Sequence, residues 1–493
     1  MKLFNRKSSV GGDAVILTVS KFMTTVIGVV TSMLLARFRT LEEYGTYSQI
    51  IMVIDLASTL ILLGLPNSVN YFLAKADTDK QKQKFLSVYL TLSTVLTVII
   101  GVCLTLATPI IIEYFDNPMI TTLVYVFNIY PWSTLMFNSL SNVCVVYGKS
   151  NRLIIFNIIY SLATLFILLA AKLFLWSFGT YMLVYMLSTL AFAIFAVAWI
   201  QKISGGIRIR IDFKLIKEIF VFCIPMGLAS VVGTLNAELD KLVIANFFTT
   251  AEYAIFANAA KQLPVTMLTD SLTAVLLPCI VRLMKEKRSD DVVRVWGNAI
   301  NISFTFMCLI AGGLFVFAPD VMSVFYSAKY ATPEGIAVFR VYASILLLRF
   351  TYWGIVLNAT GKTKFVLYSS IASMVLNLAG NVASYYAFGF VGPAVSTFAV
   401  TFVIAFAQLY FTTKELNVSI KTIFPWKNMA KMLLQTIAFA SVFWVIRYIL
   451  LAELSGLIAI VASIALGAVW AVAYALINFK NIIFNWKQLN QGQ

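Results

Sequence analysis

Ten ionisable residues lie inside stretches of sequence that are otherwise apolar. Six are cations and four are acids: Lys21, Lys241, Lys261, Arg340, Arg349 and Arg447, and Asp55, Glu238, Asp240 and Asp270. A charge held in hydrocarbon costs about 3 kcal/mol or more, so such groups are expected to face a cavity or one another. Because Coulomb attraction is strongest at low dielectric constant, the excess of cations predicts a cavity that binds an anionic group.

The depth of each cation in its apolar stretch separates three primary ligands of the anion from two secondary ones: Lys21, Lys261 and Arg349, then Arg37 and Lys241. The acids are expected either to neutralise these cations or to bind a coupling H⁺ or Na⁺: Asp55, Asp240, Asp270 and Glu238. The sequence leaves both roles open. Glu238 and Lys241 are also spaced to pair on one helix face, and Arg37 can instead extend its charge to the membrane interface.

The composition shows which solvent surrounds these residues. The chain of 493 residues is 60% hydrophobic and 12% charged, whereas a soluble domain carries about 25% charged residues. Fourteen apolar stretches are each long enough for a helix to cross a hydrocarbon core, which takes about 20 residues. They are residues 14–36, 46–74, 85–113, 118–147, 152–175, 179–200, 214–247, 250–284, 291–317, 334–360, 363–388, 390–413, 429–451 and 456–478. These stretches are longer than barrel strands, which take about 10 residues, and lack their alternating polarity. The sequence therefore predicts an all-α polytopic membrane protein with about 14 transmembrane helices.

The basic residues are unevenly distributed between the predicted loops. Of 37 Lys and Arg residues, 27 fall in the termini and alternate loops on one side, and four fall on the other side. This asymmetry places both termini and the basic loops in the cytoplasm. It also excludes a nucleic-acid partner, because the cations form no continuous basic face. The five cysteines all lie within predicted spans, so neither a disulfide nor a metal site is expected.

Two pairs of similar segments indicate an internal repeat. "ARFRTLEEYGTYSQ" at 36–49 returns as "ANFFTTAEYAIFAN" 209 positions later, and "YGKSNRLIIFNIIYSLATL" at 147–165 returns as "TGKTKFVLYSSIASMVLNL" 213 positions later. Each pair is separated by six predicted spans, which predicts two pseudo-symmetric six-helix lobes, residues 1–203 and 204–416. Residues 417–493 then form an appended helix pair. In transporters with parallel repeats, the substrate binds between the repeats near the middle of the membrane.

These segments also carry a family resemblance. "LLARFRTLEEYGTYSQ", "ELDKLVIANFFTTAEYAIFANAAKQLP", "VFYSAKYATPEG", "NATGKTK" and "FGFVGPAVST" occur in the order and spacing typical of polysaccharide exporters. The chain resembles the Wzx-like exporter family of the multidrug/oligosaccharidyl-lipid/polysaccharide (MOP) superfamily. The second copy of the repeat departs from the first, because Asn246 stands where the first copy has Arg37.

The resemblance implies a flippase that moves an undecaprenyl-diphosphate-linked oligosaccharide from the cytoplasmic to the outer leaflet of the bacterial cytoplasmic membrane. The implied partners are membrane lipids and the glycosyltransferases and polymerase of the same pathway, with no cofactor beyond a coupling H⁺ or Na⁺. The alternative is a cation-coupled multidrug antiporter of the same superfamily. An enzyme is not expected, because the chain has no histidine to act as an intramembrane base.

Overall fold

The computed structural model describes residues 10–261, 267–451, 454 and 456–491, except the side chains of 10–22, 267–268, 270, 456–457 and 490–491. The chain divides into two compact units. Unit 1 comprises Met1–Glu238 with Ala245–Ala254, and unit 2 comprises Leu239–Ile244 with Ile255–Gln493. The division passes through α9 and α10, whereas the predicted lobes meet at residues 203 and 204. The lobe boundaries stay a prediction.

Unit 1 holds the helices of the first half of the chain. They are α1 (Val10–Phe38), α2 (Leu41–Leu62), α3 (Leu65–Lys75), α4 (Asp79–Leu106), α5 (Thr108–Phe115), η1 (Pro118–Leu123), α6 (Tyr125–Val146), α7 (Ser150–Leu173), α8 (Phe178–Ile203) and most of α9 (Phe213–Phe247). Within this unit α6 packs against α4 and α8, and α1 packs against α7.

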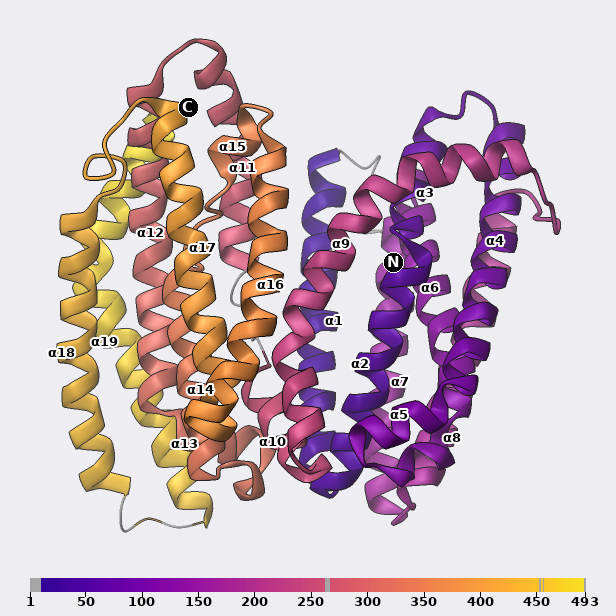
Figure 1. Cartoon of the computed structure of the whole chain (residues 1–493), viewed down its shortest axis with the longest axis horizontal. Helices are drawn as coiled ribbons and strands as arrows, with labels where there is room; N and C mark the ends of the chain where they lie inside the picture. Colours follow the sequence, from indigo (N-terminus) through magenta and orange to yellow (C-terminus); the bar gives the residue numbers. More distant parts are fainter. Residues whose placement is uncertain (1–9, 262–266, 452–453, 455, 492–493) are drawn as a thin grey trace, which may run out of the picture. The chain divides into compact units, whose positions relative to one another are not determined.

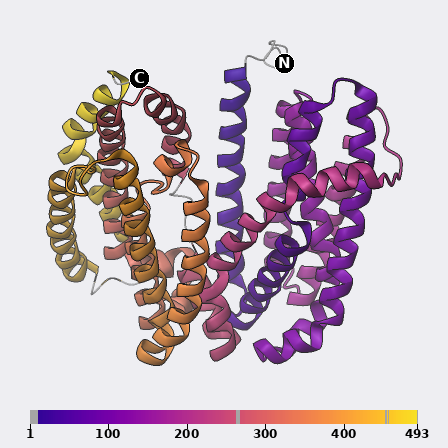
Figure 2. The same ribbon diagram turned by 45° about the horizontal axis from the view of Figure 1, so that its top comes forward.

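Unit 2 holds the remaining helices, although the first turn of α10, up to Ala254, belongs to unit 1. They are α10 (Thr250–Ala259), α11 (Met267–Lys285), α12 (Ser289–Val316), α13 (Ala318–Val321), η3 (Met322–Tyr326), η4 (Ala328–Tyr330), α14 (Pro333–Ile345), η5 (Leu346–Leu348), α15 (Ile355–Ala359), α16 (Thr363–Phe388), η6 (Gly389–Val391), α17 (Gly392–Leu416), α18 (Trp426–Leu451) and α19 (Gly456–Gln491). α16 and α17 lie side by side, and the pair α18 and α19 packs on α12 (Figures 1 and 2).

The helical membrane architecture expected from the composition is confirmed. The described residues contain helices but no strand. Nine helical segments within these ranges are long and apolar enough to cross a membrane, and one of them, Thr363–Leu416, joins α16 to α17. The count of fourteen spans stays a prediction, as does the symmetry of the lobes.

The two copies of the first repeated segment start a helix in the same way. Thr40 precedes α2 and forms a capping box with Glu43: the Glu43 amide donates to Thr40 Oγ1 at 3.1 Å, and the Thr40 amide donates to Glu43 Oε2 at 3.2 Å. Thr249 and Glu252 repeat both bonds at the start of α10, at 3.3 and 2.9 Å. A capping box satisfies amides that a helix start would otherwise leave unpaired. The repeat therefore records two identical helix starts.

Several spans predicted as continuous are broken, which corrects the sequence interpretation, and three of these breaks lie beside polar cavities. The stretch 46–74 is divided between α2 and α3, and the stretch 250–284 between α10 and α11. The stretch 334–360 is divided into α14, η5 and α15, with irregular backbone at 349–354. In a membrane, irregular backbone is stable only where it is buried in protein or lines a cavity. The breaks therefore direct attention to the cavities beside them.

Candidate functional site

Two of the cations that are predicted to bind the anion line one small cavity in unit 2. Lys261 follows the end of α10, and Arg349 caps η5 at the start of the 349–354 break. Both side chains are partly buried and contribute to the wall of the same cavity, together with residues of α12 and α14. The structure thus brings together two positions that are 88 residues apart in the sequence.

Side chains of α11, of α12 and of the segment itself hold the backbone at the break. The hydroxyl of Thr269 on α11 donates to the Arg349 carbonyl at 3.0 Å. Trp353 Nε1 donates to the Leu348 carbonyl at 2.8 Å, and Trp296 on α12 donates to the hydroxyl of Thr351 at 2.9 Å. The first two bonds satisfy carbonyls at the break and the third fixes a side chain of the segment, which explains how irregular backbone persists at this depth. Arg349 is thereby held on a defined segment rather than on a loose loop.

An acid predicted to neutralise the cations acts on Arg349. Asp240 on α9 is 5% exposed, and its carboxylate interacts electrostatically with the guanidinium of Arg349. This interaction joins α9 to the irregular segment beyond α14. Each charge offsets part of the cost of burying the other, because an isolated charge in a low-dielectric interior is expensive.

The same cavity contains a polar group that the sequence interpretation missed. Tyr342 on α14 lies in its wall, and its hydroxyl is buried without a hydrogen-bond partner among the described residues. A buried hydroxyl that lacks a partner costs about 1–3 kcal/mol. Such a group is suited to a ligand that supplies the missing bond. Tyr342 stands seven residues before Arg349, about two helical turns, and that spacing was the available signal.

The volume of this cavity limits what it can hold in this conformation. It measures about 30 Å³, which is room for about two water molecules. A phosphate-sized group therefore cannot enter without movement of the walls. The walls end at the break beside η5, so the irregular segment 349–354 is the natural place for such movement.

Unit 1 contains a larger cavity around Asp55. It measures about 300 Å³ and is lined by hydroxyl and amide side chains from four helices: Asp55, Ser58 and Thr59 on α2, Thr134 and Asn138 on α6, and Thr234 on α9, beside Pro66 on α3. The Asp55 side chain is exposed in this space. A carboxylate among hydroxyl and carbonyl oxygens is the donor set preferred by hard cations, and it also serves a proton.

This second cavity lies at the break between α2 and α3. Leu63 and Gly64 both have positive φ, 41° and 76°, and α9 crosses them closely. A Cβ added to Gly227 on α9 would lie 2.2 Å from the Leu63 carbonyl carbon and oxygen. Asn142 on α6 donates to the carbonyl of Pro66 at 3.1 Å, which satisfies backbone freed by the break. Glycine is therefore required on α9 at this crossing.

The remaining predicted site residues are placed as follows. The side chains of Lys21 and Asp270 lie outside the described residues. Arg37 is exposed in the last turn of α1, in unit 1. Glu238 and Lys241 are both half-buried on α9. Arg37, Glu238 and Lys241 line neither of the two cavities as the structure describes them, and the roles of all five residues stay predictions.

Comparison with known proteins places the chain in a family. A sequence profile of the polysaccharide biosynthesis protein family matches residues 34–333, which is more than half of the chain. The chain belongs to this family. The capsular polysaccharide biosynthesis protein CapF of Staphylococcus aureus is 26% identical over 148 residues. This match covers 30% of the chain and 37% of CapF, so the chain aligns with little more than a third of that relative's length.

Solved structures with a similar fold are transporters of the MOP superfamily and a lipid flippase. The lipid II flippase MurJ in its inward closed conformation has a TM-score of 0.72 at 14% identity, covering 95% of this chain and all of MurJ. An inward-facing multidrug resistance MATE family transporter of the MOP superfamily has a TM-score of 0.64 at 14% identity, covering 82% and 98%. These similarities show the fold. The chain is thus a member of the polysaccharide biosynthesis protein family, and its fold is similar to those of MurJ and the MATE family transporter.

Proposed function

We propose that this protein is a flippase for an undecaprenyl-diphosphate-linked oligosaccharide. The lipid-linked unit moves from the cytoplasmic to the outer leaflet of the cytoplasmic membrane by alternating access. The observation that carries the proposal is the convergence of Lys261, Arg349 and the unpartnered Tyr342 hydroxyl on one cavity. Two cations and a hydroxyl donor in a low-dielectric wall are suited to a diphosphate, because charge-assisted hydrogen bonds to phosphate oxygens are strong.

The buried acid beside this cavity gives the site a resting state. In the absence of substrate, Asp240 balances Arg349. When the diphosphate enters, it replaces the carboxylate as the partner of the guanidinium, and the segment 349–354 moves to enlarge the cavity. Lys21, Arg37 and Lys241 remain further candidate ligands of the same anion. The polyprenyl chain stays in lipid throughout, so only the polar part crosses between protein walls.

The acidic cavity of unit 1 is proposed to supply the driving force. Asp55 stands among hydroxyl groups in about 300 Å³, which is enough room for a partly hydrated Na⁺ or a proton with ordered water. Asp270 and Glu238 stay candidates for the same role. This cavity is also what favours the second candidate function, a cation-coupled multidrug antiporter, since an organic cation would seek a carboxylate.

Export of surface polysaccharide in a strain lacking this protein tests the proposal. Wild type, Lys261→Ala, Arg349→Ala and Lys21→Ala are expressed at equal membrane levels, with the exposed Lys364→Ala as a control of equal charge change. Lipid-linked oligosaccharide on the cytoplasmic side is then quantified. We expect it to accumulate in the null strain and in the Lys261 and Arg349 variants, and to disappear with wild type and Lys364→Ala.

Two other results of this experiment would change the conclusion. A null strain that accumulates no lipid-linked intermediate but becomes sensitive to cationic dyes would overturn the flippase in favour of the antiporter. Full complementation by every variant would leave the flippase in place and remove the proposed anion site.

A further inference from the structure

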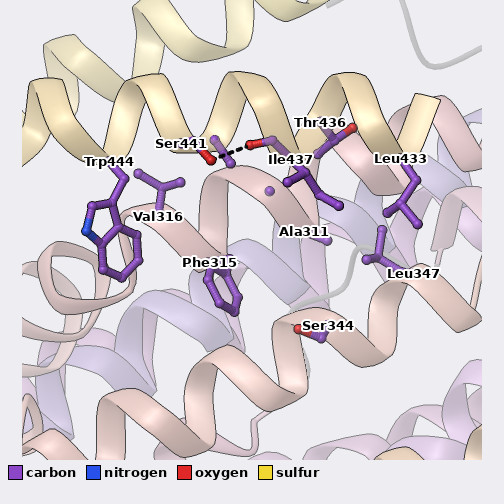
Figure 3. Close-up of a pocket in the computed structure, with 12 residues that line it drawn as sticks. Ala311, Phe315, Val316, Ser344, Leu347, Leu433, Thr436, Ile437, Ser441 and Trp444 are labelled. Carbon is purple, nitrogen blue, oxygen red and sulfur yellow. Dashed lines mark hydrogen bonds between the residues drawn. The ribbon is translucent and has the colours of Figure 1, made fainter. Parts of the chain in front are cut away.

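A second cavity of unit 2 lies along α18 and is almost entirely apolar. It measures about 330 Å³ and is lined by side chains of α12, α14, η5 and α18, among them Ala311, Phe315, Leu347, Leu433, Ile437 and Trp444. Its hydroxyl groups are already hydrogen-bonded. Ser441 donates to the Ile437 carbonyl at 2.9 Å (Figure 3), Ser344 donates to the Arg340 carbonyl at 2.9 Å, and Thr436 bonds to its own helix and to Tyr474 on α19. The cavity therefore offers hydrocarbon contacts and no polar partner along its length.

The length of this groove matches one leaflet. Leu433 and Trp444 are eleven residues apart on α18, which corresponds to about 16 Å along the helix. The hydrocarbon of a bilayer is about 30 Å thick, so the groove spans about half of it. Trp444 lies at the end nearer the C-terminus of α18, which the distribution of basic loops places away from the cytoplasm.

A cation stands at the Trp444 end of the groove. The guanidinium of Arg340 lies 4.3 Å from the ring centroid of Trp444 and 5.5 Å from that of Phe315. Arg340 Nε donates to the Phe315 carbonyl at 3.1 Å. Both rings also line the groove. Stacking on aromatic faces fixes the plane of the guanidinium and leaves its edge able to donate to a planar or tetrahedral anion.

A neighbouring arginine shows what is different about Arg340. Arg447 on α18 is neutralised, since it donates to both carboxylate oxygens of Asp320 at 2.5 and 3.2 Å, and Ser463 donates to the same carboxylate at 3.1 Å. Arg340 forms no salt bridge with a carboxylate within the described ranges. Its electrostatic neighbour is Arg447, another cation. Among the residues that the structure describes, the Trp444 end of the groove therefore carries a positive charge that forms no salt bridge.

We propose that this groove binds an anionic glycerophospholipid of the outer leaflet, with one acyl chain along α18 and the phosphate at Arg340. Any apolar groove at this depth is covered by lipid chains, so the groove alone would select no lipid. The selection comes from the guanidinium, because a partly buried cation with free donor groups favours a headgroup of net negative charge through charge-assisted hydrogen bonds. The site is separate from the cavity of Lys261 and Arg349 and does not depend on the transported substrate.

Native mass spectrometry of the intact protein with equal amounts of dioleoyl phosphatidylglycerol and dioleoyl phosphatidylcholine tests this site. The two lipids have the same chains and differ in headgroup charge. We expect wild type to retain phosphatidylglycerol preferentially, and Arg340→Gln to lower that preference about tenfold, as expected for loss of one charge-assisted hydrogen bond. Arg340→Lys should keep part of the preference. Ser441→Phe fills the groove from an exposed position and should reduce retention of the preferred lipid without removing the charge.

The control is Lys172→Gln, a cation of unit 1 that also contacts an aromatic ring, 5.6 Å from the centroid of Phe38. It removes one charge and should leave the lipid preference unchanged. An unaltered preference in Arg340→Gln would overturn the proposal. So would displacement of phosphatidylglycerol by an equal amount of undecaprenyl phosphate in wild type but not in Arg340→Gln, because the groove would then serve the carrier lipid of the substrate.

Discussion

The two polar cavities of this protein lie near helices that start in the same way, but the cavities differ in charge and in volume. Each lies near a helix whose start is fixed by the same capping box, Thr40 with Glu43 before α2 and Thr249 with Glu252 before α10. In unit 1 the helix carries Asp55 to a roomy cavity of about 300 Å³. In unit 2 the chain beyond α10 carries Lys261 to a tight cavity of about 30 Å³ that also contains Arg349.

The two copies of the repeat therefore share their helix starts but not the positions of their charged residues. A shift of 209 positions places Lys261 on Met52 and Asp55 on Pro264, so neither site has a counterpart in the other copy. A roomy acidic site is suited to a small cation, and a tight cationic site that must open is suited to an anion in transit. A flippase coupled to a cation gradient requires both kinds of site. Each of the following predictions tests one of the two cavities or the helix starts beside them.

The largest expected effect is the loss of Arg349. Arg349→Ala removes the positive charge that acts on the buried carboxylate of Asp240, which is expected to destabilise the protein by about 3 kcal/mol. Arg349→Ala combined with Asp240→Asn should recover most of that stability, measured by thermal unfolding in detergent, and should still not export polysaccharide. If the double variant regains export, the cation serves the fold and not the substrate.

The crossing of α9 over the α2–α3 break is the next most sensitive point. Gly227→Ala places a Cβ 2.2 Å from the Leu63 carbonyl and should destabilise unit 1 by about 1–3 kcal/mol or more, as overpacking does. Gly233→Ala on the same helix meets nothing within 4 Å and is the matched control. Equal unfolding temperatures for the two variants would contradict the close approach that shapes the acidic cavity.

Removing the carboxylate of unit 1 separates coupling from substrate binding. Asp55→Asn keeps the size of the side chain and its exposed position, so the protein should fold normally. Transport in proteoliposomes should fall about tenfold or more and lose its response to an imposed H⁺ or Na⁺ gradient, because the neutral amide neither titrates nor balances a cation. The exposed Asp77→Asn serves as the control; an undiminished gradient response in Asp55→Asn would exclude this acid.

The tyrosine of the cationic cavity should distinguish a binding site from a structural one. Tyr342→Phe removes a buried hydroxyl that has no partner within the described part of the chain, so stability should stay equal or rise slightly. Export should nevertheless fall about tenfold, the effect of one lost hydrogen bond to a charged group. A variant that loses stability together with export would mean that the hydroxyl supports packing only.

The smallest expected effect concerns the helix caps that the two copies of the repeat share. Thr40→Ala and Thr249→Ala should each cost about 1 kcal/mol through loss of the helix cap, and Thr→Ser at either position should restore it. The measurement is the unfolding free energy of the two variants side by side. A large difference between them would show that the two helix starts are not equivalent, although the same bonds are formed at both.

Part of the cavities could be read from the sequence and part could not. The break between α2 and α3 follows a recognisable Gly-Leu-Pro signal at Gly64 to Pro66, although the hydropathy of residues 46–74 predicts a single span. The break at 349–354 has only Gly354 as a local sequence signal. Its carbonyls find partners on α11 and within the segment itself, and the partner on α11 cannot be read from the neighbouring residues. Lys261 and Arg349 were identified as anion ligands from their depth alone, and that role awaits the export experiment.

The sequence by itself determined the solvent, the helical class and the repeated helix starts, because hydrophobicity, spacing and capping act over a few residues. Only the tertiary structure decided which charges meet. Asp240 and Arg349 are 109 residues apart, and Asp320 and Arg447 are 127 residues apart. Pairing over such separations depends on how helices pack and where they break, and neither leaves a periodic signal in the chain. The cations could therefore be counted in advance, but their partners could not.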